Sequence, residues 1–147
     1  MEHLLLVGDE NTYLRKRGER VELAEGVLDP EDLEAAYGET VETHIGEEFA
    51  VVKPDLNDLF ERALEQRTQT ISHKDAGYIV ARTGIGKDST VAEAGTGSAF
   101  LTLSLARVVG EVRSYEERED HLEAARENIE KVGAENVTLT LRDVKEE

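Results

Sequence analysis

The sequence predicts an α/β protein in which a small β domain precedes one half of a doubly wound parallel sheet. Short apolar runs separated by turn residues fill positions 1–53, and the spacing of apolar residues becomes helical from Pro54 onward. After Gly84, strand and helix patterns alternate in the order βαβαβ. The first of these strands leads directly into a glycine-rich turn, Gly95-Thr96-Gly97, which is typical of a nucleotide-cofactor loop.

The N-terminal part is predicted to be a β domain over residues 1–53. We expect strands at residues 4–7, 13–14, 21–23 and 49–52, because each run is apolar or alternating and is bounded by Gly, Asp, Asn or Glu. One helical insert is expected at Pro30 to Tyr37, with Asp29 as its N-cap. Residues 54–72 are expected to form a helical linker.

Residues 73–147 are predicted to hold the half sheet. A helix is expected to begin after Ser72, which can cap it, and to end near Gly84. The elements that follow are expected to be a strand at 90–94, a helix at 99–109, a strand at 112–116, a helix at 120–132 and a strand at 137–141. Gly110 and Gly133 are the expected stops of the two helices.

Composition indicates a soluble cytoplasmic protein with an unusual charge. The chain has no cysteine, no apolar segment long enough to cross a bilayer, and 33 acidic against 17 basic residues, a net charge of −16. Such acidity argues against attraction to nucleic acid in dilute salt. In a salt-rich cytoplasm the Debye length falls to about 3 Å at 1 M, and the acidity then serves solubility without excluding RNA. An acidic protein from an ordinary habitat is the alternative.

Three stretches at strand ends are candidates for a binding site. In a βαβ unit the ligand lies at the carboxyl ends of the strands, which here means beside Gly95 to Ala99, Glu116 and Asp143. Glu116 follows Gly95 by about the number of residues that separates such a turn from the acidic residue that accepts hydrogen bonds from a ribose hydroxyl. The alternative is that Glu116 is one more acid in an acid-rich chain.

The residues around the turn favour one class of cofactor. A dinucleotide loop needs a third glycine where this chain has Phe100, so NAD is disfavoured. Glu93, just before the turn, would repel a pyrophosphate but suits a cationic amino-acid group. S-adenosylmethionine, with its ammonium and sulfonium, meets these demands, although Glu93 could also be an ordinary solvated carboxylate.

These motifs resemble the tRNA (adenine-58-N1)-methyltransferase family in its archaeal and bacterial form. The residues that carry the likeness to its cofactor motifs are Glu93 to Ser98, Leu101-Thr102 and Ser114-Tyr115-Glu116. Thr43 to Phe49 is similar to part of the family's small β domain, and Thr68 to Ala76 resembles its linker. The resemblance covers nearly the whole chain.

The resemblance implies a Rossmann-like methyltransferase that transfers a methyl group from S-adenosylmethionine to N1 of an adenine in the T loop of tRNA, commonly as a homotetramer. It implies that Gln69 and the loop residues Thr96, Gly97, Ser98 and Ala99 contact the cofactor, Glu116 its ribose, and Asp143 its adenine. Ala99 stands where the family usually has another glycine, and we expect its backbone donor to remain available.

The family's catalytic aspartate lies at the end of a fourth sheet strand, and this sequence ends at Glu147, before that point. We therefore expect a chain truncated after the third strand, with no catalytic residue of its own. The alternatives are a non-catalytic module that binds S-adenosylmethionine or RNA, and a subunit that needs a partner for catalysis. A methyltransferase for a small molecule or protein would share the loop but not the β module, so the segment from Thr43 argues against it.

Two further residue groups were considered as sites. The four histidines, at positions 3, 44, 73 and 121, lack the spacing of a metal site, and none is expected. The basic run Arg15-Lys16-Arg17, with Arg20, is expected on a hairpin of the β module. It is either a solvated turn or a contact for RNA phosphates.

Overall fold

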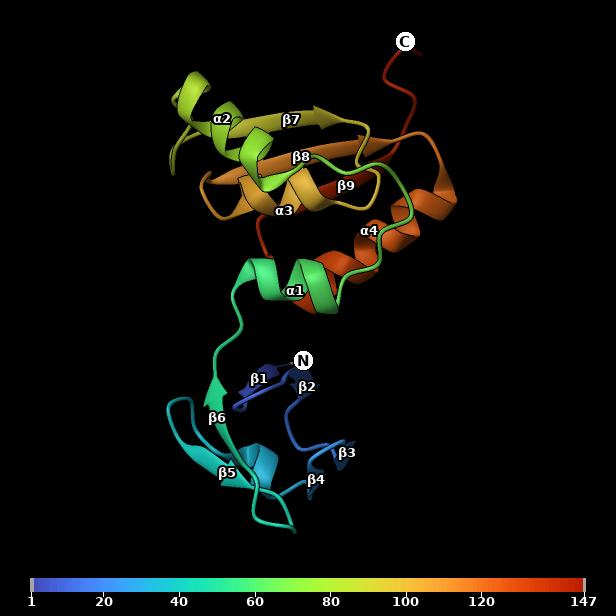
Figure 1. The fold of residues 1–147 in the computed structure, drawn as a ribbon. Helices are drawn as coiled ribbons and strands as arrows, with labels where there is room; N and C mark the ends of the chain where they lie inside the picture. Colours follow the sequence, from blue (N-terminus) through green and yellow to red (C-terminus); the bar gives the residue numbers. More distant parts are fainter. Residues whose placement is uncertain (1, 147) are drawn as a thin grey trace. The chain divides into compact units, whose positions relative to one another are not determined.

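The computed structural model describes residues 2–146, which form two compact units that divide between Ala63 and Leu64 (Figure 1). Each unit has its own cluster of buried apolar side chains. Within the described residues, no helix is both long and apolar enough to cross a bilayer.

The first unit is built on an antiparallel sheet with strand order β2-β1-β6-β5. These strands are β1 (His3–Val7), β2 (Thr12–Lys16), β5 (Thr40–Glu42) and β6 (Glu48–Val52). A separate hairpin pairs β3 (Val21–Leu23) with β4 (Gly26–Leu28). The expected β domain is therefore present.

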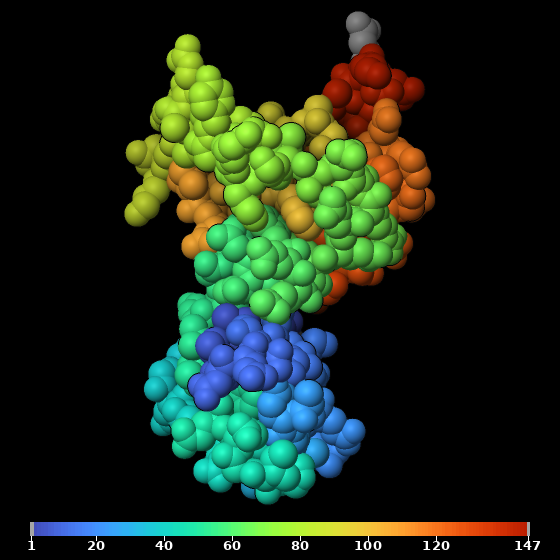
Figure 2. All heavy atoms as spheres, viewed as in Figure 1, coloured from blue at the N-terminus to red at the C-terminus, as the bar shows by residue number. Residues whose placement is uncertain are grey.

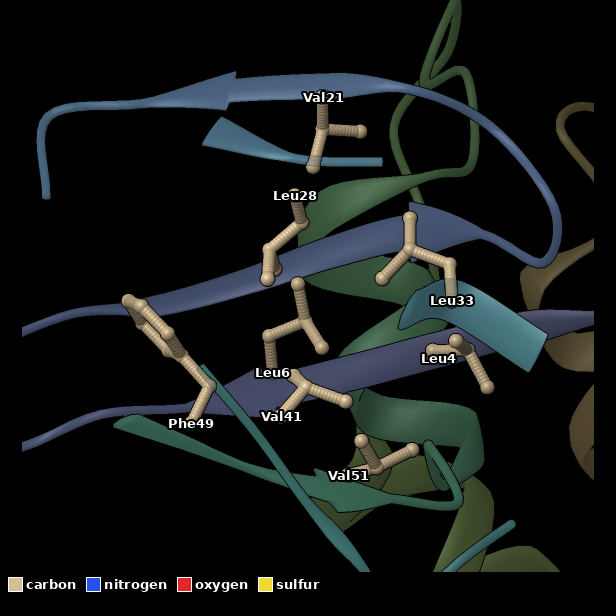
Figure 3. Packing of buried hydrophobic residues seen from close by; sticks show 8 residues of the cluster. All are labelled: Leu4, Leu6, Val21, Leu28, Leu33, Val41, Phe49 and Val51. Carbon is tan, nitrogen blue, oxygen red and sulfur yellow. The ribbon is translucent and has the colours of Figure 1, made fainter. Parts of the chain in front are cut away.

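The core of the first unit lies on one face of its sheet. Leu4 and Leu6 alternate along β1, and Leu6 is paired in register with Val51 of β6 (Figure 3). Leu28 and Leu33 approach this face from the hairpin and from the segment after it, and both are fully buried. Burial alternates with period two along β6, and this fixes the register of β6, because a one-residue slip would turn Phe49 and Val51 to solvent.

The prediction of a helix at residues 30–37 is wrong. The structure has only a 3₁₀ turn, η1 (Asp32–Glu34), whose N-cap is Glu31 and not Asp29. Asp32 accepts a hydrogen bond from the Asp29 amide and Glu39 accepts one from the Ala36 amide, so acidic side chains close local turns in competition with a helix. Leu33 is the only buried residue of the turn, which leaves a longer helix with little apolar surface to bury.

The first unit ends with α1 (Leu56–Arg62), where the helical spacing is confirmed. Asp55 caps it by accepting hydrogen bonds from the amides of Asn57 and Asp58, and the Asp58 carboxylate accepts one from the Asp55 amide. The predicted linker is helical only at α1, since residues 63–72 form neither helix nor strand.

The second unit contains the predicted parallel half sheet. Its strands, β7 (Thr90–Ala94), β8 (Glu111–Glu116) and β9 (Val137–Leu141), pair in the order β7-β8-β9. The helices are α2 (His73–Thr83), α3 (Phe100–Ala106) and α4 (Glu119–Val132). The α/β fold class and the βαβαβ order are thus confirmed.

Helix ends in this unit follow the expected capping residues, with one exception. Ser72 caps α2, and the left-handed residues Gly84 and Gly133 end α2 and α4. Helix α3 stops at Ala106, three residues before the predicted end. The Asn136 side chain donates hydrogen bonds to the carbonyls of Ala106 and Val109, which satisfies groups that a longer helix would have left at its end. Leu105 of α3 packs with Val109 and Val112 in a buried apolar cluster of this unit.

Candidate functional site

The carboxyl ends of the three parallel strands meet at one edge of the second unit. The turn at Gly95 follows β7, Glu116 ends β8, and Asp143 follows β9. Two hollows adjoin this edge, and both are lined by Ala94 and Gly95. This is where a doubly wound sheet binds its ligand.

The first hollow, of about 180 Å³, lies between the glycine turn and the segment before α2. Glu93 and the turn residues Thr96, Gly97 and Ser98 line it together with Gln69, Thr70 and Ile71. The second hollow, of about 230 Å³, is lined by Tyr115, Glu116, Arg142 and Asp143, among others. Eight predicted site residues therefore line one hollow or the other, and Ala99 lines neither.

The glycine turn is held against β8 by its own backbone. The amides of Gly95 and Thr96 both donate to the carbonyl of Tyr115, at 2.8 and 3.2 Å. Gly95 has a φ of +88°, and a Cβ added there would meet no protein atom within 4 Å. The missing side chain of Gly95 thus leaves open space at the edge that both hollows share.

Glu93 is a largely buried carboxylate held by two hydroxyl groups. Its Oε2 accepts hydrogen bonds from Thr102 Oγ1 at 2.5 Å and from Ser114 Oγ at 2.7 Å. Ser114 lies directly opposite Glu93 in the parallel pairing and also bonds Thr96 Oγ1 at 2.7 Å. Burial raises the pKa of Glu93, and the hydrogen bonds from Ser114 and Thr102 act in the opposite direction. Because both hydroxyls bind Oε2, the other oxygen can accept a ligand group.

Glu116 is a buried carboxylate that also binds the glycine turn. Its Oε2 accepts the Gly97 amide at 2.9 Å, its Oε1 accepts the Arg118 amide at 3.1 Å, and His121 Nδ1 lies 3.7 Å from Oε1. A carboxylate has about four lone-pair positions, so Glu116 can still accept hydroxyl groups of a ligand. Glu116 thus lines the second hollow and accepts the amide of Gly97, which lines the first.

Ala99 differs from the sequence expectation. Its amide donates to the carbonyl of Thr96 at 2.9 Å, so the backbone donor is not available to a ligand. It is fully buried and, among residues 2–146, is the only non-glycine residue with positive φ, at +65°. This conformation explains why a glycine suits the position, since a Cβ is strained there.

The remaining predicted residues differ in exposure. Gln69 is exposed at the first hollow, and Asp143 is partly exposed at the second, where its Oδ1 accepts the Lys145 amide at 2.9 Å. Ser98 is buried, and its hydroxyl accepts the Arg67 amide at 2.9 Å. Its side chain is therefore committed within the protein.

The family resemblance includes Thr102 and Ser114 in its cofactor motifs, but it did not predict that their hydroxyls hold Glu93. The register of β7 against β8 would have found Ser114, because a shift that aligns Val91 with Val112 places Ser114 opposite Glu93. Thr102 is found only from the way α3 packs. Within the described residues, no three acidic or histidine side chains cluster as metal ligands.

In the basic run of the first unit, Arg15 and Lys16 end β2, which pairs with β1 in a hairpin, and Arg17 begins the turn that follows. The side chains of this run have local partners. Arg17 pairs with Glu2 at 2.9 Å, Arg20 with Glu22 at 2.8 Å, and Lys16 with Glu19 at 3.9 Å. Arg15 lies over the ring of Tyr13. These local contacts favour a solvated turn over a phosphate site.

Comparison with known proteins finds relatives that are described as tRNA methyltransferases. The chain is 37% identical over 124 residues to the tRNA (adenine(57)-N(1)/adenine(58)-N(1))-methyltransferase TrmI of Methanocaldococcus jannaschii, which covers 82% of this chain and 43% of that protein. It is 44% identical over 100 residues to the tRNA (adenine(58)-N(1))-methyltransferase TrmI of Thermus thermophilus, covering 66% and 39%. The chain thus spans less than half the length of these relatives.

Two solved structures resemble it over 99% of its length. One is a SAM-dependent O-methyltransferase from Thermotoga maritima, with a TM-score of 0.86, 29% identity and 57% of that chain covered. The other is the tRNA (m1A58) methyltransferase TrmI from Aquifex aeolicus, with a TM-score of 0.81, 29% identity and 59% covered. The family described as tRNA methyltransferase complex GCD14 subunit matches residues 49–147, and the chain belongs to this family.

Proposed function

We propose that the second unit binds S-adenosylmethionine across the two hollows. The observation that carries this proposal is the pair of carboxylates on either side of the Gly95 turn, Glu93 at the first hollow and Glu116 at the second. In the proposed complex, Glu93 binds the cofactor's ammonium beside Gln69, and Glu116 accepts the ribose hydroxyls. Asp143 accepts a hydrogen bond from the adenine. The O-methyltransferase among the similar structures is described as SAM-dependent.

Backbone hydrogen bonding supports this cofactor over a dinucleotide. A pyrophosphate needs free amides at the turn, but those of Gly95, Thr96, Gly97 and Ala99 all donate to groups of the protein. A carboxylate at Glu93 would also repel phosphate charge. A cofactor whose cationic end meets a carboxylate avoids both difficulties.

We further propose that the chain acts in N1-methylation of adenine in the T loop of tRNA. The relatives from M. jannaschii and T. thermophilus are described as enzymes of this reaction. The adenine N1 lone pair would attack the methyl carbon, the carbon–sulfur bond would break, and S-adenosylhomocysteine would leave. Transfer of this kind depends on holding the sulfonium methyl in line with N1, which a two-ended grip on the cofactor favours.

Methyl transfer to unmodified tRNA tests this proposal. The chain is incubated with tRNA and S-adenosylmethionine that carries a labelled methyl group, in molar KCl, and the modified nucleoside and its position are then mapped. The expected product is N1-methyladenosine in the T loop. Cofactor binding without any transfer would reduce the role of this chain to a cofactor-binding module or to a subunit that needs a partner.

Two broader properties belong to the same proposal, adaptation to salt and assembly into an oligomer. The net charge of −16 supports adaptation to a salt-rich cytoplasm, such as that of a halophilic archaeon, because salt screens repulsion among surface carboxylates. Assembly as a homo-oligomer follows the tetramer that the family resemblance implies. Relatives in yeasts are described as catalytic subunits, which supports action within an assembly. Light scattering in molar KCl measures the mass of the proposed oligomer.

A further inference from the structure

Asn128 of α4 joins three separate segments of the second unit. Its side chain is fully buried, and its Nδ2 donates to the carbonyls of Glu65 at 2.8 Å and Ser98 at 3.0 Å. Its Oδ1 accepts the Glu65 amide at 2.9 Å. One amide group thus binds both backbone groups of Glu65 and the backbone of the glycine turn.

Ser98 makes a second connection to the same segment. Its hydroxyl accepts the Arg67 amide at 2.9 Å and lies 3.2 Å from Thr68 Oγ1. Thr68 packs so closely on the turn that a Cβ added to Gly97 would lie 2.7 Å from its Oγ1. Residues 65–68 therefore lie directly against the glycine turn.

These contacts matter because residues 63–72 have no regular secondary structure. They lie at the surface, coloured green in the space-filling view (Figure 2). A segment without a helix or a strand ladder has no repeated backbone bonds to hold it. The side chains of Asn128 and Ser98 supply bonds in their place, immediately before Gln69, Thr70 and Ile71 line the first hollow.

We propose that Asn128 and Ser98 are positioning residues for the methionine end of the cofactor. By fixing residues 65–68 against the glycine turn, they set the wall that Gln69 to Ile71 form opposite Glu93. The inference rests on the proposed function, because it assigns the first hollow to the methionine end of S-adenosylmethionine. Neither side chain needs to contact the cofactor for this role.

Replacement of Ser98 by alanine tests the role with little risk to folding, whereas loss of the buried Asn128 amide can unfold the chain. Ser98→Ala removes the acceptor of the Arg67 amide and the contact with Thr68. The matched control is Ser104→Ala, because the Ser104 hydroxyl donates only within α3, to the carbonyl of Phe100 at 2.9 Å. Both variants replace a serine by alanine, one in the loop that ends the glycine turn and the other inside the helix that follows it.

Two ligands distinguish positioning from a general loss of structure. S-adenosylmethionine has the methionine end, and 5′-methylthioadenosine shares the adenosine but lacks the amino-acid group. Loss of two hydrogen bonds to the segment is expected to weaken S-adenosylmethionine about tenfold in Ser98→Ala. Methylthioadenosine is expected to change less than about twofold, and Ser104→Ala should bind both ligands as the wild type does. Exchange of the Arg67 amide hydrogen should also become faster in Ser98→Ala.

The outcomes separate the two proposals. Equal binding of S-adenosylmethionine by Ser98→Ala and the wild type, or an equal loss of both ligands in Ser98→Ala, would overturn the positioning role. A wild-type chain that binds neither ligand would overturn the cofactor proposal itself, and the positioning role with it. Selective loss of S-adenosylmethionine together with faster exchange at Arg67 is the result that supports the inference.

Discussion

At Gly95 the absence of a side chain does two separate things. The residue adopts a φ of +88°, and it leaves open the space at the edge shared by the two hollows. The first property concerns stability, because L side chains are strained in this region. The second concerns binding, and a pair of substitutions can separate them.

Gly95→Ala is expected to abolish cofactor binding, because the new methyl group would occupy the ligand's space. The matched control is Gly133→Ala at the end of α4, where φ is +75° and an added Cβ also meets nothing within 4 Å. Each variant should lose about 1 kcal/mol of unfolding free energy through backbone strain. Urea denaturation measures that loss, and calorimetry measures binding. Normal binding by Gly95→Ala would contradict the site.

Glu93 gives the site a predicted pH dependence. Its raised pKa means that the folded, ligand-free chain binds more protons than the unfolded chain above the ordinary glutamate pKa. The contribution to stability is therefore complete below the ordinary pKa and is lost as pH rises through the raised value. An ammonium ligand prefers the ionised form, so affinity for S-adenosylmethionine should rise with pH through the same interval.

Binding measured from the ordinary glutamate pKa of about 4.3 upward to neutral pH checks this expectation, with Glu93→Gln as the comparison. The glutamine cannot ionise, so its weaker binding should be nearly independent of pH. An identical pH profile in Glu93→Gln and the wild type would assign the dependence to another group. Methylthioadenosine, which lacks the ammonium, should show no such rise.

At the scale of elements, local patterns predicted the second unit better than the first. Strands at 90–94, 112–116 and 137–141 and the helix α4 have long, regular apolar spacing, and the structure confirms them. Strands β4 and β5 were not predicted, because each has three residues and neither places two apolar side chains on one face, as Val21 and Leu23 of β3 do. The acidic residues after Asp29 close turns through their side chains, so their helical pattern did not produce a helix.

Some residues of the candidate site could be predicted from the sequence, and others could not. Residues in the turn and at strand ends, such as Glu93 and Glu116, could be predicted because topology alone brings strand ends together. The bonds from Asn128 to Glu65 could not, because the partners lie 63 residues apart and meet only through the packing of α4. The prediction that the Ala99 amide is available to a ligand was wrong because this amide donates to the Thr96 carbonyl in a local turn of the loop.

The connection between α3 and β8 has a steric requirement that can be tested. A Cβ added to Gly110 would lie 2.4 Å from the carbonyl oxygen of Lys87, a backbone atom that cannot move freely. Gly110→Ala is therefore expected to destabilise the chain by about 2 kcal/mol in urea denaturation. Gly86→Ala is the control, because its Cβ would meet nothing within 4 Å, and it should change stability by less than about 0.5 kcal/mol. Equal stability of the two variants would contradict the packing described at this connection.

At the scale of the whole molecule, charge sets the conditions under which the fold is stable. The net charge of −16 implies strong repulsion in dilute buffer, and the ion pairs described are mostly local and exposed. Exposed ion pairs of this kind contribute little to stability. Screening of the carboxylate repulsion by salt should therefore be the larger electrostatic effect on the stability of the fold.

Far-UV circular dichroism during removal of KCl tests the proposed salt adaptation. Helix and strand signals are expected to be complete in molar KCl and to decrease as the salt is lowered, because repulsion between carboxylates is then unscreened. Sodium sulfate at matched ionic strength separates screening from a specific effect of potassium. A fully folded chain in dilute buffer would contradict the adaptation while leaving the cofactor site unaffected.

The central claim is that the strand ends of the second unit bind S-adenosylmethionine, and calorimetric titration in molar KCl tests it most directly. Glu116→Ala should weaken binding at least about tenfold, because the carboxylate holds the Gly97 amide and, in the proposed complex, also accepts the ribose hydroxyls. Glu130→Ala, which removes an exposed carboxylate from α4, is the matched control for the change in charge and should bind as the wild type does. One bound cofactor per chain, lost in Glu116→Ala alone, is the predicted result. No binding by the wild type, or undiminished binding by Glu116→Ala, would contradict the account.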